Sequence, residues 1–413
     1  MEKESRFSAF GAFAILSTAF LWIFEVVVVG PSMGVISAAF PESTQSDARY
    51  MMLIVYLTCF IFSILAGRLA KKYDKKKILL IGLLIYGITG MLPIFATSMS
   101  QIIVMRLITG IGVGLALPMT GAIIADHTSG QKRMKMLAMA AIVANIAGIV
   151  IVPIVGVLMV ISWKASFYMF ALALVIALVV LIGVPKSPPI KQENASTETP
   201  VKAKIPSIWY FYTACVAFIW CMNGVYPVNT AFFVMGETTL TPTLIGVLMM
   251  ATPLGGIIGS YLFPKLNKVL KSFYVPVGLF VFAIGFVLLS IGHSLTFLLI
   301  ASVVVGMAAG LLYPYALNVI AIRAKSPAQK DMGMGLLGAS LPIGGFLGAP
   351  FCQLVFLANI PNAMTPYRFL FMASACLLLV IAIISIFLRA KKSTDLYEIE
   401  KTKDLPQTMQ SAQ

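Results

Sequence analysis

Two charged side chains lie inside long apolar stretches of this sequence, where charge is costly to keep. Glu25 falls within the apolar run 9–38, and Arg106 falls within the run 101–125. A charge at the centre of a bilayer costs about 2.5–3.5 kcal/mol on insertion scales, and such residues usually face a cavity or a partner. Desolvation disfavours the charged form of a carboxyl group. Glu25 is therefore a candidate to take up and release a proton, or to pair with a cationic substrate.

Arg106 needs an acceptor because a guanidinium keeps its proton in proteins. Glu25 is the one acidic candidate that we expect at similar depth, and the backbone carbonyls of the first apolar run are the alternative partner. The arginine then either pins two helices together or responds to the protonation of Glu25. A neutral Glu25 bonded to helix backbone is the alternative without a transport role. The residue types leave these alternatives open.

The composition predicts the kind of secondary structure that carries Glu25 and Arg106. The chain has 413 residues, of which 60% are hydrophobic and 11% are charged. Its mean hydropathy is +0.96. Soluble domains carry about 25% charged residues, so a soluble globular protein is excluded. Continuous apolar runs of about 20 residues are typical of membrane-spanning helices rather than of barrel strands. The predicted fold class is all-α integral membrane.

Twelve apolar runs separate into two sets of six around a polar linker. We expect an N-terminal six-helix bundle over 1–184, a cytoplasmic linker over 185–206, a C-terminal six-helix bundle over 207–389 and a cytoplasmic tail over 390–413. Pro, Ser, Thr, Lys and Glu dominate the linker, a composition that cannot form a core. The predicted runs are 9–38, 50–70, 78–98, 101–125, 136–160, 165–184, 207–235, 243–263, 273–292, 295–321, 332–358 and 367–389.

The net charge of +15 follows from the loops and not from nucleic-acid binding. Short cytoplasmic loops of membrane proteins carry an excess of Lys and Arg. Almost all loop cations of this chain fall on one side if both termini are inside, and only Arg49, Lys164 and Arg368 fall on the other. We therefore predict a multi-pass protein of the cell (inner) membrane with both termini in the cytoplasm, in contact with lipid and not with nucleic acid.

The two sets of six also repeat in sequence. Gly110-x-x-x-Gly114 in the fourth run recurs as Gly306-x-x-x-Gly310 in the tenth, and Pro153 in the fifth run has a counterpart in the eleventh. Small residues let helix backbones approach closely, and a proline inside a helix favours a kink. Parallel repeats of six helices are a known transporter design, with the binding site between the halves at mid-membrane.

These features resemble the major facilitator superfamily over essentially the whole chain. The family's loop signature after the second helix is a glycine, a leucine, an aspartate and a basic run, and here it reads Gly67-Arg-Leu-Ala-Lys71-Lys-Tyr-Asp74-Lys75-Lys-Lys. The resemblance implies a cytoplasmic gating motif at Gly67, Lys71, Asp74 and Lys75. Lys71 stands where the family has the aspartate that helps to latch the gate. Asp74 is a candidate substitute at a non-equivalent position.

Within that superfamily the chain looks most like the bacterial drug:proton antiporter and sugar efflux group. Arg106 and Gly110 resemble the buried-arginine motif of the superfamily, Pro153 belongs to a degenerate form of the glycine–proline motif of drug:proton antiporters, and Glu25 is a single acid in the first helix. The resemblance implies that helices one, four, seven and ten line the cavity, with proton coupling at Glu25 and Arg106. Aromatic rings, methionine and amides make an adaptable pocket. The predicted substrate-binding residues are Met119, Asn145, Trp220, Asn223, Tyr226, Tyr313, Tyr315 and Asn318.

Other classes of function lack their characteristic residues. The two histidines, His127 and His293, are near loops, and no ATP-binding glycine loop with Lys-Ser/Thr is present. We therefore expect no enzyme, no cofactor and no metal. The predicted function is a secondary active transporter, working as a monomer, that exports small amphipathic molecules or drugs against protons by alternating access. The alternative is a metabolite (sugar or nucleoside) exporter, symporter or facilitator.

Overall fold

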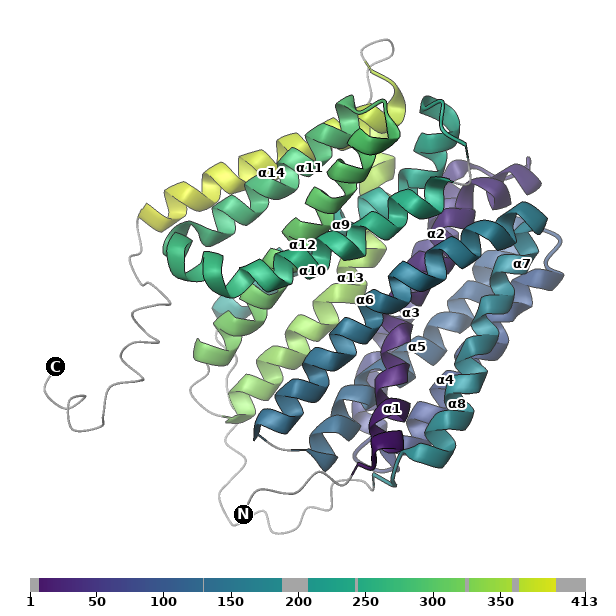
Figure 1. Cartoon of the computed structure of the whole chain (residues 1–413), viewed down its shortest axis with the longest axis vertical. Helices are drawn as coiled ribbons and strands as arrows, with labels where there is room; N and C mark the ends of the chain where they lie inside the picture. Colours follow the sequence, from purple (N-terminus) through teal and green to yellow (C-terminus); the bar gives the residue numbers. More distant parts are fainter. Residues whose placement is uncertain are drawn as a thin grey trace, which may run out of the picture. The chain divides into compact units, whose positions relative to one another are not determined.

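The computed structural model describes residues 7–128, 130–187, 207–241, 244–323, 327–358 and 364–390, and over these residues the chain is helical without β-strands. Twelve helical stretches among them are long and apolar enough to cross a membrane. The predicted all-α, twelve-span fold is confirmed, and the long helices dominate the ribbon (Figure 1). A helix satisfies its backbone hydrogen bonds internally, so continuous apolar runs of this length fold into spanning helices.

The first six spans consist of eight α-helices and three short 3-10 turns. A 3-10 turn interrupts the first span before Glu25, and another joins two helices of the sixth span. The elements are α1 (Ala9–Ser17), η1 (Thr18–Phe20), α2 (Leu21–Ala39), α3 (Gln45–Leu69), α4 (Lys75–Met91), η2 (Leu92–Phe95), α5 (Met99–His127), α6 (Gly130–Ile161), α7 (Trp163–Phe167), η3 (Tyr168–Phe170) and α8 (Ala171–Gly183).

The second six spans are mostly single helices. The elements are α9 (Ser207–Glu237), α10 (Leu244–Leu270), η4 (Lys271–Phe273), α11 (Tyr274–Ile291), α12 (Leu295–Arg323), α13 (Pro327–Leu357) and α14 (Pro366–Ala390). The linker beyond Ser187 and the predicted tail from residue 391 lie outside the described residues.

One helix start corrects the sequence analysis. We expected the second span to begin at residue 50, with Arg49 in a loop, but α3 begins at Gln45. Thr44 and Asp47 form a capping box there: the Asp47 backbone N–H donates to Thr44 Oγ1, and the Thr44 backbone N–H donates to the Asp47 carboxylate. This cap satisfies backbone donors at the polar end of the helix. Arg49 therefore lies inside α3, and its side chain is buried.

The chain divides into two compact units that do not coincide with the two sequence halves. Counting the described residues alone, unit 1 takes those of Met1–Val201, Gly224–Met250 and Gly345–Gln353. Unit 2 takes those of Lys202–Asn223, Ala251–Gly344 and Leu354–Gln413. Unit 1 therefore holds the first six spans together with parts of α9, α10 and α13. The division into two six-helix bundles stays a prediction.

Glycines set the closest helix contacts in both units. A Cβ at Gly110 of α5 would meet the Val55 carbonyl oxygen and the Thr58 hydroxyl of α3. In unit 2 a Cβ at Gly306 of α12 would meet the Thr252 carbonyl oxygen of α10. The fourth span thus packs against the backbone of the second in the first six, and the tenth against the eighth in the second six. Gly110 and Gly306 therefore have the same packing role at corresponding positions of the two sequence repeats.

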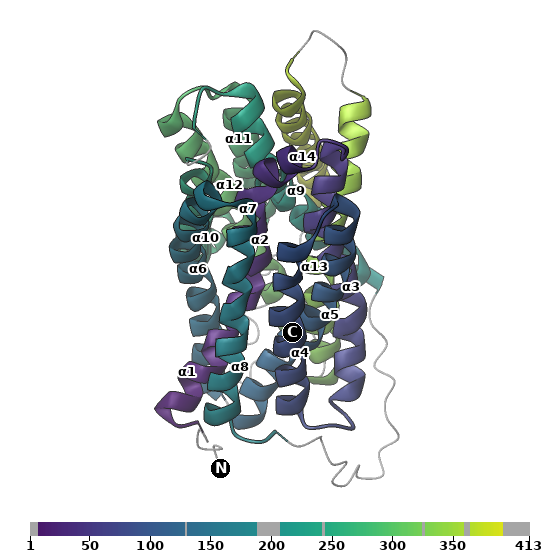
Figure 2. The ribbon, with the colours of Figure 1, turned by 90° about the vertical axis from the view of Figure 1, so that its right-hand side faces the viewer.

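Within unit 1, α8 lies between α1 and α4 (Figure 2). Its glycine at the end of the helix, Gly183, leaves space that Ala14 and Phe10 of α1 occupy. On the opposite side Leu174 of α8 fills the space beside Gly87 of α4. The sixth span therefore holds Phe170 of η3 in the interior of unit 1, whereas Tyr168 of the same turn is exposed.

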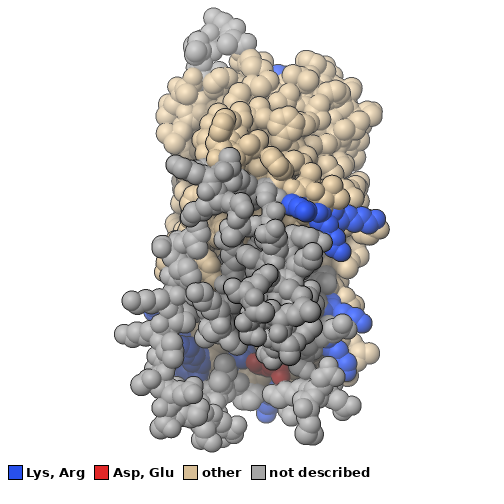
Figure 3. Space-filling view, turned by 90° about the vertical axis from the view of Figure 1, so that its left-hand side faces the viewer, with Lys and Arg blue, Asp and Glu red and all other residues tan. Residues whose placement is uncertain are grey.

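The described surface carries little charge. In the face shown in Figure 3, Lys and Arg side chains outnumber Asp and Glu, and most of the remaining described surface is uncharged. Many large apolar side chains are exposed, among them Ile88, Ile182 and Phe387. A water-soluble protein does not expose apolar side chains on this scale, so this surface is suited to lipid.

Candidate proton-coupling and gating site

Glu25 and Arg106 come from two helices that meet inside unit 1. Glu25 lies in the second turn of α2, the helix that follows η1, and Arg106 lies two turns into α5. A hydrogen bond of 2.7 Å between the hydroxyls of Thr18 and Thr120 ties η1 to α5. The turn before Glu25 is therefore attached to the helix that carries Arg106.

The two side chains form a buried ion pair between Arg106 Nη2 and Glu25 Oε2. Arg106 is 0% exposed and Glu25 is 2% exposed. Among the described residues, Glu25 Oε1 and the remaining guanidinium nitrogens have no hydrogen-bond partner. The pair therefore depends on itself for charge compensation, because each ion would be strongly disfavoured alone in a buried site.

An aromatic cluster that the sequence analysis did not foresee encloses the arginine. The Arg106 Cζ atom lies over the ring of Phe170, 5.2 Å from its centroid. The rings of Phe24 and Tyr86 meet the Phe170 ring edge-to-face, with centroids 5.4 and 5.3 Å away. All three rings are buried. The sequence signal was weak, because these residues belong to three separate apolar runs.

This arrangement has two charge states. With Glu25 ionised the pair is neutral overall. With Glu25 protonated the carboxyl no longer balances the guanidinium, which keeps its charge. A proton gained or lost here changes the net charge of a buried site by one unit, and such a change can bias a conformational equilibrium.

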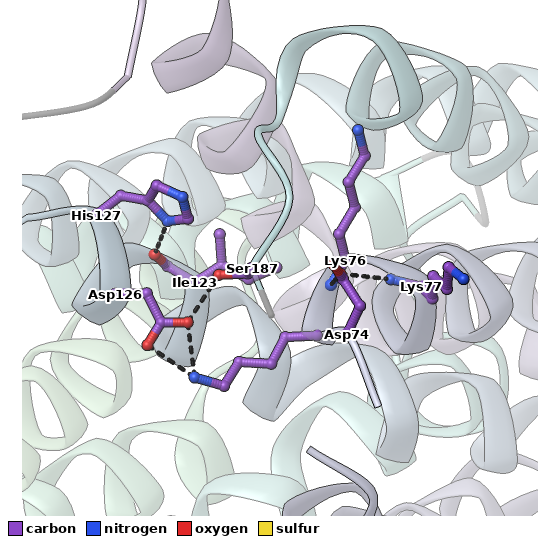
Figure 4. Close-up of polar contacts among 8 residues, drawn as sticks. Asp74, Lys76, Lys77, Ile123, Asp126, His127 and Ser187 are labelled. Atoms are coloured by element: carbon purple, nitrogen blue, oxygen red, sulfur yellow. Dashed lines mark hydrogen bonds and ion pairs between the residues drawn. The ribbon is translucent and has the colours of Figure 1, made fainter. Parts of the chain in front are cut away.

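A second polar cluster surrounds the predicted gating motif. Lys75 is buried at the first residue of α4, and its Nζ lies 2.7 and 2.6 Å from the carboxylate oxygens of Asp126 at the end of α5. Ser187 Oγ donates to the same carboxylate at 2.7 Å, as Figure 4 shows. The Lys75 backbone N–H donates to the Ser187 carbonyl at 3.0 Å. Asp126 thus joins α4, α5 and the chain that leaves α8.

The remaining motif residues have other positions. Asp74 is the N-cap of α4 and accepts hydrogen bonds from the backbone N–H groups of Lys76 and Lys77 at 2.8 and 3.4 Å (Figure 4). Its carboxylate therefore caps its own helix, and the role of substitute for the family's latch aspartate stays a prediction. Gly67 and Lys71 are exposed, and a Cβ at Gly67 would meet nothing.

Sequence analysis missed Asp126, although a signal was present. It is an acid at the loop end of the fourth run, one helix away from a basic loop. The neighbouring His127 faces the other way, with Nδ1 3.0 Å from the Ile123 carbonyl oxygen (Figure 4). Of the described start of the predicted linker, Ser187 is held at this cluster.

Three of the predicted substrate-binding residues belong to unit 1. Met119 of α5 and Tyr226 of α9 are buried, and Asn145 of α6 is half-buried. Met119 neighbours Thr120, whose hydroxyl bonds to Thr18 near the start of the helix of Glu25.

The other five belong to unit 2, and the structure brings two of them together. Trp220 of α9 and Tyr313 of α12 have ring centroids 5.7 Å apart. Tyr315 instead stacks on Tyr274 of α11 at 5.1 Å. Asn318 is half-buried.

Asn223 has a side-chain hydrogen-bond acceptor that is not used within the described residues. Its side-chain oxygen is buried and has no hydrogen-bond partner among the described residues. A buried carbonyl oxygen without a donor is costly, so this atom can accept a further hydrogen bond.

Arg49 forms a third polar cluster, also missed from sequence. Its Nε donates to Asn229 Oδ1 of α9 at 2.9 Å, and its guanidinium lies 5.6 Å from the centroid of the Phe232 ring. Asn229 Nδ2 in turn lies 3.3 Å from Cys352 Sγ of α13. Inside unit 1 this cluster joins the second span to parts of the seventh and eleventh, at the helix ends opposite the Lys75 cluster.

Two further predictions concern packing and metals. Gly114 of α5 lies against the Cys59 carbonyl oxygen of α3, where a Cβ would be 2.7 Å from it, and Gly310 of α12 lies against the Gly256 carbonyl oxygen of α10. Pro153 is inside α6 and exposed. Over the described parts of the chain, no three His, Cys, Asp or Glu side chains are grouped to hold a metal ion.

Comparison with known sequences agrees with this architecture. The family model described as "Major Facilitator Superfamily" matches residues 6–267 and residues 215–411. The "Uncharacterized MFS-type transporter MJ1560" of Methanocaldococcus jannaschii is 23% identical over 92% of this chain and 98% of its own length.

Other relatives match over shorter stretches. NiaP of Bacillus subtilis, provisionally named a niacin/nicotinamide transporter, is 23% identical over 46% of this chain, which spans about half (48%) of that relative. "Multidrug resistance protein 3" of the same organism is 31% identical over 34% of this chain and 27% of its own length. Among solved structures, a peptide transporter POT in complex with alafosfalin has a TM-score of 0.74 at 15% identity, covering 94% of this chain and 97% of that one.

Proposed function

Because this chain belongs to the major facilitator superfamily and is a multi-pass membrane transporter rather than an enzyme, we propose that it couples the export of small amphipathic molecules or drugs to the entry of protons. The single observation that carries the proposal is the buried ion pair between Glu25 and Arg106. A membrane protein keeps such a pair at a cost, and the carboxyl is the member that can change its charge.

In the proposed cycle a proton from outside neutralises Glu25 and frees Arg106 from its counter-charge. The state that is open to the cytoplasm then releases that proton, and the pair forms again. Substrate is carried in the opposite direction as the two predicted bundles alternate. Contacts to the substrate are assigned to the aromatic, methionine and amide side chains named above. The proposed working unit is a monomer in the cell (inner) membrane.

The chemistry of those side chains supports amphipathic substrates. Trp220 and Tyr313 offer adjacent aromatic faces. Aromatic faces bind planar apolar groups without demanding one shape. Partial similarity to a relative named for multidrug resistance points the same way.

A metabolite carrier is the second candidate, and the Asn223 oxygen favours it. A buried acceptor of this kind suits a substrate with hydroxyl or amine groups. Similarity to NiaP, named for niacin or nicotinamide, also supports a small polar aromatic cargo. The two candidates predict different substrates. A metabolite carrier should saturate at low concentrations of a polar metabolite, and a drug exporter should saturate at low concentrations of an apolar dye.

The test is transport in proteoliposomes under an imposed pH gradient, with a panel of fluorescent amphipathic dyes as substrate. Glu25→Gln should abolish pH-driven transport and retain dye exchange without a gradient, because the glutamine mimics the protonated carboxyl but binds no proton. Glu42→Gln, at an exposed position in the α2–α3 loop, is the matched control and should behave as the parent. Full pH-driven transport by Glu25→Gln would refute the proton-carrying role.

A further inference from the structure

We propose that Phe170 is a positioning residue that holds the Arg106 guanidinium in place while Glu25 carries a proton. The inference rests on the proposed proton coupling and assigns a part of it to a neutral side chain. Its starting observation is the ring of Phe170 directly beneath the guanidinium, at 5.2 Å. Both side chains are fully buried.

The ring cannot easily leave this position. Gly90 of α4 has no side chain, and a Cβ there would overlap Phe170 Cδ1. Phe24 and Tyr86 meet the ring edge-to-face at interplanar angles of 67° and 69°. Phe167 stacks on it from the neighbouring turn at 6.1 Å. Four neighbours therefore fix the ring, and its π-face is offered to Arg106 in either charge state of Glu25.

The attraction matters most when the carboxyl is neutral. The face of an aromatic ring carries negative potential, so it attracts a guanidinium and repels a carboxylate. In the ion pair these two effects oppose each other. After protonation only the attraction remains, and Arg106 has no other hydrogen-bond partner among the described residues. Phe170 thus stabilises the protonated state of the site relative to the ionised state.

Other groups around the site do not replace this role. The helices packed around the site carry other charged or titratable side chains. Among the described residues, each of these side chains has another partner, carries no charge in the working pH range, or lies at a helix end. On α8 no such side chain is present among the described residues. Besides Glu25 and Arg106, the set is Asp47, Arg49, Tyr50, Tyr56, Cys59 and Arg68 on α3, Lys75, Lys76, Lys77 and Tyr86 on α4, Asp126 and His127 at the end of α5, Lys132 and Lys135 at the start of α6, Lys164 on α7, and Tyr168 in η3.

The experiment is a pH profile of dye transport for the parent, Phe170→Leu, Phe170→Met and Phe170→Tyr. Loss of the ring makes protonation of Glu25 less favourable, so the midpoint should move to lower pH by roughly half to one pH unit. Phe170→Tyr keeps the ring and should keep the midpoint. Phe167→Leu is the matched control, since Phe167 is equally buried in the same cluster but has no contact with the guanidinium in the structure.

An infrared titration supplies a second readout that does not need transport. The band of the protonated Glu25 carboxyl, identified by its loss in Glu25→Gln, should titrate at lower pH in Phe170→Leu and Phe170→Met. An unchanged midpoint in both ring-free variants would overturn the inference. A parent without any pH-dependent band or transport would instead refute the proposed function, so the two failures are distinguishable.

Discussion

At the scale of single residues, the Glu25–Arg106 pair combines one group that can lose its charge with one that cannot. Burial makes an uncompensated charge expensive for either residue, but a carboxyl escapes the cost by binding a proton and a guanidinium does not. The arginine is therefore the permanent charge of the site, and the acid is its variable partner. The aromatic ring beneath the arginine is the third participant.

This asymmetry predicts unequal stability costs. Glu25→Gln should lower stability by an amount approaching the roughly 3–5 kcal/mol that follows when a buried pair loses one partner. Arg106→Gln should cost less, because Glu25 then becomes neutral. The double variant Glu25→Gln/Arg106→Gln should recover most of the loss of Glu25→Gln. Thermal unfolding of the four proteins in detergent measures this, and additive losses in the double variant would contradict it.

At the scale of elements, short polar connections decide how the helices of unit 1 are joined. Thr18 and Thr120 tie the interrupted first span to α5. Lys75 and Asp126 tie α4 to α5, with Ser187 bonded to the same carboxylate. Such polar pairs favour one helix arrangement among several that hydrophobic packing alone would leave nearly equal.

The Lys75–Asp126 pair gives a prediction for the gating region. Lys75→Ala and Asp126→Ala should each reduce dye transport several-fold, because each leaves the other charge without its partner next to Ser187. The exchange Lys75→Asp/Asp126→Lys should restore transport in part, since the pair then forms with its order reversed. Lys72→Ala removes an exposed cation of the same loop and should have little effect.

Transport rates at equal protein density in proteoliposomes measure these variants. Equal activity of Lys75→Ala and Lys72→Ala would mean that the Lys75–Asp126 ion pair has no part in gating. Failure of the exchange variant alone would mean that the geometry around Ser187, and not charge, is what the gate requires.

At the scale of the whole molecule, twelve spans and an excess of loop cations set the predicted orientation. An even number of crossings places both termini on one side. The loop cations then assign that side to the cytoplasm, because positively charged loops are retained there.

Cysteine labelling tests the orientation with two exposed positions in loops on opposite sides. Glu42→Cys lies between the first and second spans, and Lys71→Cys lies between the second and third. In intact cells a membrane-impermeant thiol reagent should label Glu42→Cys and spare Lys71→Cys, with the parent reporting background from its own cysteines. The reverse pattern would invert the proposed topology.

The sequence by itself determined the class of fold and the number of spans, and it singled out Glu25 and Arg106 as charged residues inside apolar runs. A hydrophobic run long enough to span a bilayer folds as a helix, because a helix satisfies its own backbone hydrogen bonds. A charged residue inside such a run is easy to identify among apolar neighbours. Gly110 and Gly306 were likewise visible as small residues at repeated spacing, and the structure places both against a neighbouring helix backbone.

Only the tertiary structure decided which residues complete each site. Phe170, Asp126, Asn229 and Ser187 reach their partners from segments far apart in the sequence, and an apolar or loop-end residue carries no local sign of that contact. It also showed Arg49 inside α3 and Asp74 serving its own helix. The physical reason is that periodicity and hydropathy report the surroundings of a segment as a whole, whereas an ion pair or ring contact depends on the placement of a few atoms from different helices.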